Sequence, residues 1–267
     1  MKIWHQSFTV LEDLPAYRDA MAAHIKKVVR PDTQVEMHGQ LRGTYPTNYP
    51  GTDLGFAALG TLHGVQWVLR AIEAEREGFD AYAMATIPNP LLREIRTIVD
   101  IPVVGYGEAS YHVASMLGRR FGVLVFIDRM APLLADHVAG HGLSERCIGV
   151  RPSGVTFQQV LAGYTTPGPV IERFQESARD TIRAGADVII PGEMPLNVLL
   201  AINGVRQVDG VPILDGLAVT MKLAEAFADL HKTIGFSQTR HGYFGERPAR
   251  ERLDQVLSFY GLDRLVQ

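Results

Sequence analysis

The chain has 267 residues, of which 46% are hydrophobic and 21% charged, which is typical of a globular protein of one large or two smaller domains. Its formal net charge of −3 argues against a nucleic-acid partner. Cys147 is the only cysteine, which excludes an intrachain disulfide and a cysteine-rich metal site. No apolar run reaches the roughly 18 residues of a membrane span and the N-terminus lacks a long apolar leader, so we expect a soluble, cytoplasmic protein without a membrane partner.

Strands and helices alternate along the chain. Residues 2–8 predict a first strand, and Asp13 can cap the helix that follows, whose apolar residues keep a helical spacing. A segment over 39–55, rich in Gly, Pro, Thr, Tyr and Asn, exceeds the usual connection length and predicts either a binding loop or lid, or a solvated or subunit-contacting excursion. Further strands are predicted at 35–37, 101–104, 121–126, 146–150 and 211–214, and further helices at 57–77, 129–140, 170–184 and 217–231.

A sequence repeat organises the chain. Residues 78–92, GFDAYAMATIPNPLL, recur as residues 185–200, GADVIIPGEMPLNVLL, with an offset of 185 minus 78, or 107. Each copy predicts the end of a helix, a turn at glycine, an apolar strand and a proline-bearing loop that opens the next helix. Strand ends that meet helix N-termini favour anions, and Thr86 and Glu193 occupy this place in the two copies. The pair is the predicted site, unless the repeat reflects only a shared strand–loop–helix pattern.

This alternation and repeat predict an α/β fold of two pseudo-symmetric Rossmann-like lobes, each with a mostly parallel sheet, and an active-site cleft between them. We expect residues 1–108 plus 215–267 to form the first lobe and residues 109–214 to form the second. The last long helix then returns to the first lobe.

Three stretches resemble a known family. They are DIPVVGYGEASYHVASMLG at 100–118, FGVLVF at 121–126 and ILDGLAVTMKLAEA at 213–226. Together they resemble the aspartate/glutamate racemase superfamily, and within it the hydantoin racemase-like and allantoin racemase-like branch. The resemblance covers most of the chain and implies two pseudo-symmetric α/β lobes, no cofactor, and a catalytic cysteine on each side of the cleft. It places these cysteines at Thr86 and Glu193, so both are replaced, while Cys147 lies outside either motif.

The replacement excludes a symmetric two-thiol racemisation, because a threonine hydroxyl has no acidity comparable with that of a thiol, whose pKa is about 8.5. Glu193 is then the one plausible base, since partial desolvation can raise the pKa of a carboxyl towards neutrality. Thr86, with amides at the head of its helix, can bind a carboxylate or ureide carbonyl, or stabilise an oxyanion. The alternative for Glu193 is an acid that only complements a helix dipole.

Other candidates for substrate binding surround this pair. Gln6 and Ser7 end the first strand, where related racemases carry an asparagine. A second group follows the Gly-Glu turn at 107–108, and His112 in that group is either a proton shuttle or a packing residue. The candidates are Gln6, Ser7, Ile87, Ser110, Tyr111, His112, Gly192 and Met194. We expect no metal site.

We therefore expect a cofactor-independent enzyme that performs acid–base chemistry at a carbon next to a carbonyl, as racemases and isomerases do, on a small carboxylate or cyclic ureide. One alternative is a hydrolase or decarboxylase in which Glu193 activates water or handles the proton. Another is a non-catalytic protein that binds a small molecule. Apolar helix faces and the 39–55 segment predict a homo-oligomer.

Overall fold

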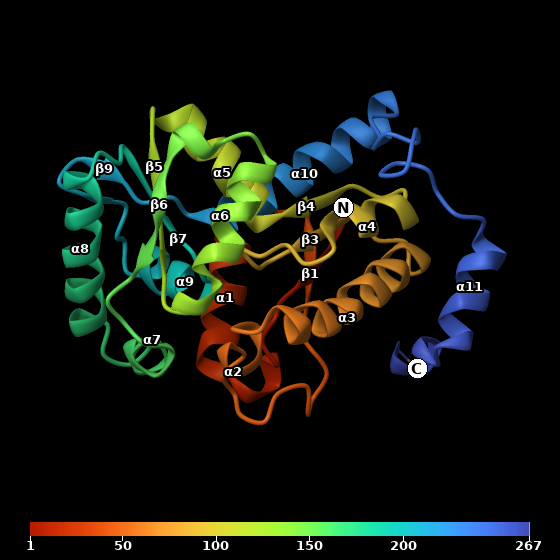
Figure 1. Ribbon diagram of the computed structural model, residues 1–267, viewed down its shortest axis with the longest axis horizontal. Helices are drawn as coiled ribbons and strands as arrows, with labels where there is room; N and C mark the ends of the chain where they lie inside the picture. Colours follow the sequence, from red (N-terminus) through yellow and green to blue (C-terminus); the bar gives the residue numbers. More distant parts are fainter. Residues whose placement is uncertain (267) are drawn as a thin grey trace.

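Four parallel strands from the first part of the chain form one sheet (Figure 1). The computed structural model describes residues 1–266. The strand order is β2-β1-β3-β4, and every neighbouring pair is parallel. The strands are β1 (Lys2–Gln6), β2 (Gln34–His38), β3 (Ala81–Met84) and β4 (Val103–Gly105). The helices of this half are α1 (Pro15–Val28), α2 (Gly51–Leu54), α3 (Ala57–Arg76) and α4 (Leu92–Ile98).

A second parallel sheet has the order β6-β5-β7, and Ile189 in β7 forms one further parallel bridge with Ile213. Its strands are β5 (Phe121–Val125), β6 (Cys147–Pro152) and β7 (Val188–Pro191), and a short antiparallel pair follows, β8 (Gln207–Val208) and β9 (Val211–Pro212). The helices are α5 (Tyr106–Leu117), α6 (Ala131–Gly140), α7 (Phe157–Gly163), α8 (Gly168–Arg183) and α9 (Met194–Ile202). The predicted α/β class with two mostly parallel sheets is confirmed.

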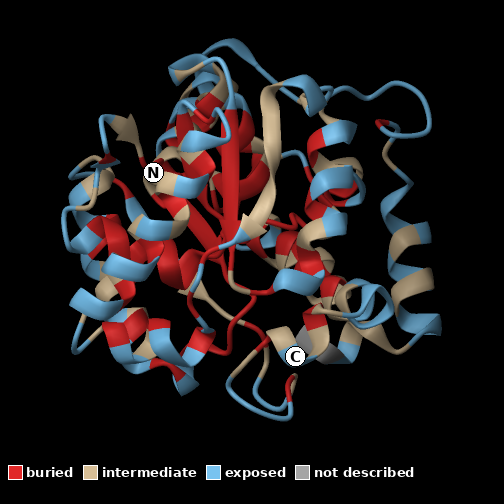
Figure 2. Cartoon of the chain, turned by 60° about the vertical axis from the view of Figure 1, so that its left-hand side comes forward, coloured by how far each residue is buried: buried red, intermediate tan, exposed pale blue. Residues whose placement is uncertain are grey.

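Most strands of the two sheets are buried. Every residue of β3, β4, β5 and β7 is buried, whereas the edge strands β2 and β6 are partly exposed (Figure 2). Most of the long surrounding helices bury one face and leave the other in solvent, whereas α9 is buried from Met194 to Ala201. This is the pattern expected when helices cover both faces of a parallel sheet.

Helix α1 begins two residues later than its predicted cap. Asp13 ends a short 3₁₀ turn (Leu11–Asp13), and Pro15 occupies the first helical turn, where its missing N–H costs nothing. The prediction that Asp13 caps α1 is therefore wrong. The predicted apolar face is confirmed, because Tyr17, Met21 and Ile25 are all buried.

The two copies of the repeat are structurally equivalent up to the end of their strands. Gly78 and Gly185 both have a positive φ, 76° and 104°, which a glycine adopts without strain at the turn before each strand. Asp80 then accepts a hydrogen bond from the backbone N–H of Lys2 at 2.7 Å. Asp187 accepts two, each at 3.1 Å, from the residues just before β5. Each aspartate thus ties a repeat strand to the strand beside it.

The copies diverge after their strands. Helix α9 begins at Met194, directly after Glu193, but α4 begins only at Leu92. The intervening loop contains Asn89 and Leu91, both with positive φ, at 46° and 53°. The proline-bearing loop predicted before the helix is present in the first copy, but the prediction that Thr86 lies at the head of that helix is wrong.

The chain ends with α10 (Gly216–Ile234), which packs against β3, β4 and α5, and with an arm that carries α11 (Arg250–Phe259). Further 3₁₀ turns are Asp128–Met130, Ser144–Arg146 and Leu262–Val266. Figure 1 shows the arm in blue along one side of the molecule. Arg240 and Arg247 attach it by hydrogen bonds to Asp100. No helix within residues 1–266 is long and apolar enough to cross a bilayer.

Candidate active site

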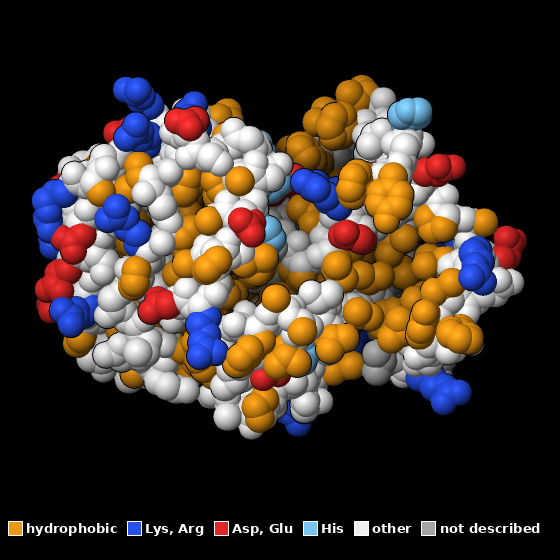
Figure 3. Space-filling view, in the orientation of Figure 1, with side chains coloured by type: hydrophobic (Ala, Val, Ile, Leu, Met, Phe, Trp, Pro, Cys, Tyr) orange, Lys and Arg blue, Asp and Glu red, His pale blue; other side chains and the backbone are white. Residues whose placement is uncertain are grey.

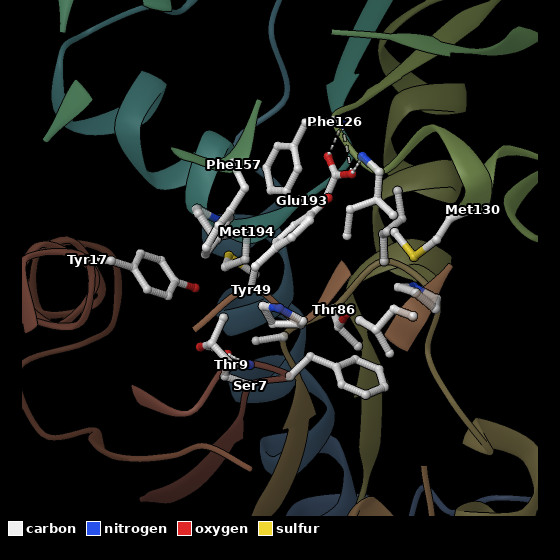
Figure 4. A pocket seen from close by; sticks show the side chains of 18 residues that line it. Ser7, Thr9, Tyr17, Tyr49, Thr86, Phe126, Met130, Phe157, Glu193 and Met194 are labelled. Carbon is white, nitrogen blue, oxygen red and sulfur yellow. Dashed lines mark hydrogen bonds between the residues drawn. The ribbon is translucent and has the colours of Figure 1, made fainter. Parts of the chain in front are cut away.

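One pocket gathers the segments that follow four parallel strands. The ends of β1, β3, β5 and β7 contribute to it, and α1, α7 and the segment at 49–54 complete its walls (Figure 4). The open space is about 440 Å³ when the solvent at its mouth is included, but only about 40 Å³ is accessible to the centre of a water molecule, so the pocket is narrow. The lining residues are Ser7, Phe8, Thr9, Tyr17, Tyr49, Pro50, Leu54, Ala85, Thr86, Ile87, Pro88, Phe126, Ile127, Met130, Phe157, Glu193, Met194 and Pro195.

Glu193 lies at the N-terminus of α9 with its side chain buried. Its carboxylate does not cap its own helix but turns to the loop after β5. Oε1 accepts hydrogen bonds from the N–H groups of Phe126 and Ile127, both at 2.9 Å, and Oε2 shares the Phe126 N–H at 3.0 Å. One side of Oε2 therefore stays free for another partner.

The surroundings of Glu193 favour its protonated form. Burial raises the pKa of Glu193 from 4.5 to about 8, while the N–H groups of Ile127 and Phe126 oppose this rise and the nearby Asp128 adds to it. A carboxyl with such a pKa exchanges a proton near neutral pH, which suits general acid–base work.

Thr86 lines the same pocket, so the structure brings the two predicted residues together. The amides predicted at the head of its helix are absent, because α4 starts at Leu92. The carbonyl of Thr86 instead accepts hydrogen bonds from the backbone and the side chain of Asn89. The hydroxyl of Thr86 remains for a ligand.

A group of hydroxyls lies on the side of the pocket formed by β1 and α1. Ser7 and Thr9 bond to each other through their hydroxyls at 2.9 Å, and the Thr9 N–H donates to the Ser7 hydroxyl. Figure 4 shows the Tyr17 hydroxyl directed from α1 towards the same space. This wall offers neutral polar contacts.

Aromatic side chains close the opposite side. Tyr49 stacks on Phe157 with ring centroids 4.8 Å apart, and Phe157 also packs against Phe126. Burial raises the pKa of Tyr49, and Glu193 and Asp128 add to the rise, so the hydroxyl stays neutral. Of the two interpretations of the 39–55 segment, the structure favours the binding loop.

The charge of the pocket is unusual for a site that would take a carboxylate. None of its described lining residues is Lys, Arg or His, and Glu193 is the only carboxyl among them. A bound carboxylate would therefore lack a cationic partner in a buried space, which is costly.

Five predicted site residues line the pocket and five do not. Ser7, Thr86, Ile87, Glu193 and Met194 are brought together. The residues placed elsewhere are Gln6, Ser110, Tyr111, His112 and Gly192.

The five residues outside the pocket have identifiable surroundings. Gln6 bonds to Trp4 and to the Gly39 carbonyl, so its amide ties the end of β1 to the loop after β2. Ser110 and Tyr111 are buried in α5, where the Tyr111 ring stacks on Phe121.

The Gly192 N–H donates to the Leu124 carbonyl, and a side chain there would meet Val125. His112 is exposed and lines a separate hollow between the body and the C-terminal arm (Figure 3). Cys147 is half-buried in β6 and does not line the pocket.

The lining residues that were not predicted from the sequence include Tyr17, Thr9, Tyr49, Phe126 and Phe157. Tyr17 belongs to the apolar face of α1 in the sequence, so its pattern signals only packing. The tyrosine content of the 39–55 segment was the one signal that pointed to an aromatic wall. Within residues 1–266 no group of three or more His, Cys, Asp or Glu side chains is placed to hold a metal ion.

Comparison with known proteins places the chain in a family. The Asp/Glu/Hydantoin racemase family matches residues 16–224. The hydantoin racemase of Pseudomonas sp. strain NS671 is 31% identical over 169 residues, 60% of this chain and 63% of that protein, so the match spans less than two thirds of the relative. The hydantoin racemase of Rhizobium meliloti is 29% identical over 196 residues, 71% of this chain and 76% of the relative.

Solved structures share the fold. The allantoin racemase of Pseudomonas fluorescens superposes with a TM-score of 0.75 at 23% identity, covering 94% of this chain and 99% of that one. The allantoin racemase of Klebsiella pneumoniae gives 0.74 at 20% identity, covering 94% of each. Since the family match spans most of the length and the fold agrees, the chain belongs to the Asp/Glu/Hydantoin racemase family, whose enzymes are named for inverting a stereocentre.

Proposed function

We propose that this protein is a cofactor-independent racemase that inverts the carbon next to a carbonyl in a neutral cyclic ureide bearing an apolar substituent. The observation that carries the proposal is Glu193, a buried carboxyl that lines the pocket and has a pKa of about 8. It is the one described lining side chain that titrates near neutral pH.

Proton transfer follows from the geometry of Glu193. Its Oε1 is held by two amide N–H groups, while Oε2 carries only the shared one. Oε2 of the ionised carboxylate removes the proton beside the carbonyl, and the electron pair moves into the carbonyl to give an enolate. Return of the proton from Glu193 to the same face restores the original enantiomer. Water protonates the opposite face to give the other enantiomer, and the hydroxide that remains takes the proton from Glu193, which returns the carboxylate to its starting state.

The walls of the pocket support a neutral ring rather than an amino acid. No described lining residue is cationic, and the aromatic side chains of Tyr49 and Phe157 offer an apolar surface. A cyclic ureide brings N–H and carbonyl groups that can bond to the hydroxyls of Ser7, Thr9 and Thr86 without a charge. The names of the relatives agree, since hydantoins are cyclic ureides with a proton beside a carbonyl.

The test is proton NMR in D₂O at pH 8 with single enantiomers of 5-benzylhydantoin and 5-isopropylhydantoin, with chiral chromatography of the same samples. The protein should replace the ring C5 proton with deuterium and form the other enantiomer, faster than a protein-free sample. Glu193→Gln should reduce this rate by about 10²-fold or more, because the acid–base group is gone.

A matched control is Glu108→Gln, because Glu108 is also a partly buried glutamate but pairs with Arg96 outside the pocket. It should retain the rate of the unaltered protein. Full activity of Glu193→Gln would refute the assigned base. Ring opening of the hydantoin without exchange would instead favour the hydrolase.

A further inference from the structure

Tyr17 is a polar exception in the pocket wall. Its side chain is 1% exposed, and its hydroxyl has no hydrogen-bond partner among the described residues. Buried polar groups are nearly always bonded, so an exception requires an explanation. No other described lining residue has a buried side-chain atom in this condition.

The neighbouring hydroxyls make hydrogen bonds of their own. The hydroxyls of Ser7 and Thr9 bond to each other, and the hydroxyl of Tyr164, whose ring lies 6.0 Å from that of Tyr17, donates to the Pro195 carbonyl at 2.7 Å. Helix α1, which carries Tyr17, packs against α9. The hydroxyl is therefore fixed and directed into the pocket without an acceptor (Figure 4).

We propose that the Tyr17 hydroxyl donates a hydrogen bond to the substrate carbonyl oxygen and is the catalytic residue that stabilises the enolate formed there. The inference rests on the proposed function. It fills the role predicted for the amides at the head of the helix after Thr86, which the late start of α4 removes. A preorganised donor aimed at a developing oxyanion is among the strongest catalytic devices known.

Burial raises the pKa of Tyr17 well above its usual value, and the nearby Ser7 hydroxyl opposes only part of this rise. The Tyr17 and Ser7 hydroxyls do not meet the geometry of a hydrogen bond. The hydroxyl stays protonated at all working pH values. It therefore acts as a donor, and Glu193 remains the base.

The experiment compares Tyr17→Phe with Tyr111→Phe. Both tyrosines are buried with an unpartnered hydroxyl, but Tyr111 lies in α5 outside the pocket. Each substitution removes a single oxygen, and neither should lower the melting temperature of the free protein. Tyr17→Phe should lower kcat for hydantoin racemisation by about 10²-fold, with a smaller change in KM. Tyr111→Phe should retain full activity.

Two further measurements separate a catalytic hydroxyl from a structural one. With a 4-thiohydantoin, whose sulfur is a weaker acceptor than oxygen, the ratio of the rates before and after Tyr17→Phe should fall towards one. Calorimetric titration with 5-benzylhydantoin should show weaker binding by Tyr17→Phe but not by Tyr111→Phe.

The results also separate this inference from the proposed function. An active protein in which Tyr17→Phe keeps the original kcat and affinity overturns the role of Tyr17 and leaves racemisation in place. If the protein does not racemise the hydantoin but binds it, and Tyr17→Phe weakens that binding, racemisation is overturned and the hydrogen bond from Tyr17 is supported. A protein that neither binds nor converts the hydantoins overturns both.

Discussion

Replacing Glu193 with glutamine should change how stability depends on pH. The glutamine fits the same space, because its carbonyl oxygen can take the place of Oε1 and accept from Phe126 and Ile127. Its amide nitrogen takes the place of Oε2, which only shares the Phe126 N–H. The substitution thus removes a titration and keeps most of the contacts.

The size of the effect follows from the pKa of Glu193, which burial raises from 4.5 to about 8. Below pH 4.5 the carboxyl is neutral in both the folded and unfolded chain. Between the two values only the unfolded chain ionises, so the folded state loses stability as pH rises. At about 1.4 kcal/mol per pH unit, the loss reaches roughly 5 kcal/mol above pH 8 and is missing in Glu193→Gln.

The assay is urea denaturation of both proteins from pH 5 to 9, followed by circular dichroism. The difference in unfolding free energy should shift steadily in favour of Glu193→Gln as pH rises and then level off above pH 8. Glu108→Gln serves as the control, and its difference should not follow this course. A constant difference, or one that moves against Glu193→Gln at high pH, would refute the raised pKa.

Two other substitutions test the scaffold. His24→Ala should lower the free energy of unfolding by about 3 kcal/mol at pH 7 in urea titrations, because it removes the 2.7 Å partner of the largely buried Asp215. Burial alone would raise the pKa of Asp215, but His24 and the other partners of Asp215 lower it. The loss of unfolding free energy should therefore shrink below pH 4, and a loss that does not depend on pH would contradict this account. Gly107→Ala places a Cβ 2.3 Å from the Ile87 carbonyl oxygen. It should lower the free energy of unfolding by about 2 kcal/mol in the same assay and reduce racemase activity, and unchanged stability would contradict this prediction.

The repeat allowed much of the fold to be predicted, because its features are local. The glycine with positive φ and the aspartate that ties neighbouring strands recur in both copies, and they act within a few residues of each strand. The sequence also placed Thr86 and Glu193 in one pocket, since both follow equivalent strands.

The late start of α4 could not be predicted, because tertiary contacts decide it. The Asn89 side chain accepts from the Glu108 N–H and donates to the Thr86 carbonyl, which holds a loop where a helix would otherwise begin. Only glycine at 105 and 107 leaves room for this side chain. Tyr17 was missed for a similar reason, since the packing of α1 on α9 determines where its ring points.

The unequal ends of the two repeat copies have a consequence for the kinetics of racemisation. One copy places the carboxyl of Glu193 in the pocket and the other places the hydroxyl of Thr86, so the two enantiomers meet different groups. The equilibrium constant between enantiomers is one, and thermodynamics then requires kcat/KM to be equal in both directions. The asymmetry of the pocket can therefore appear only as differences in kcat and KM that accompany each other. The enantiomer with the lower KM must also have the lower kcat.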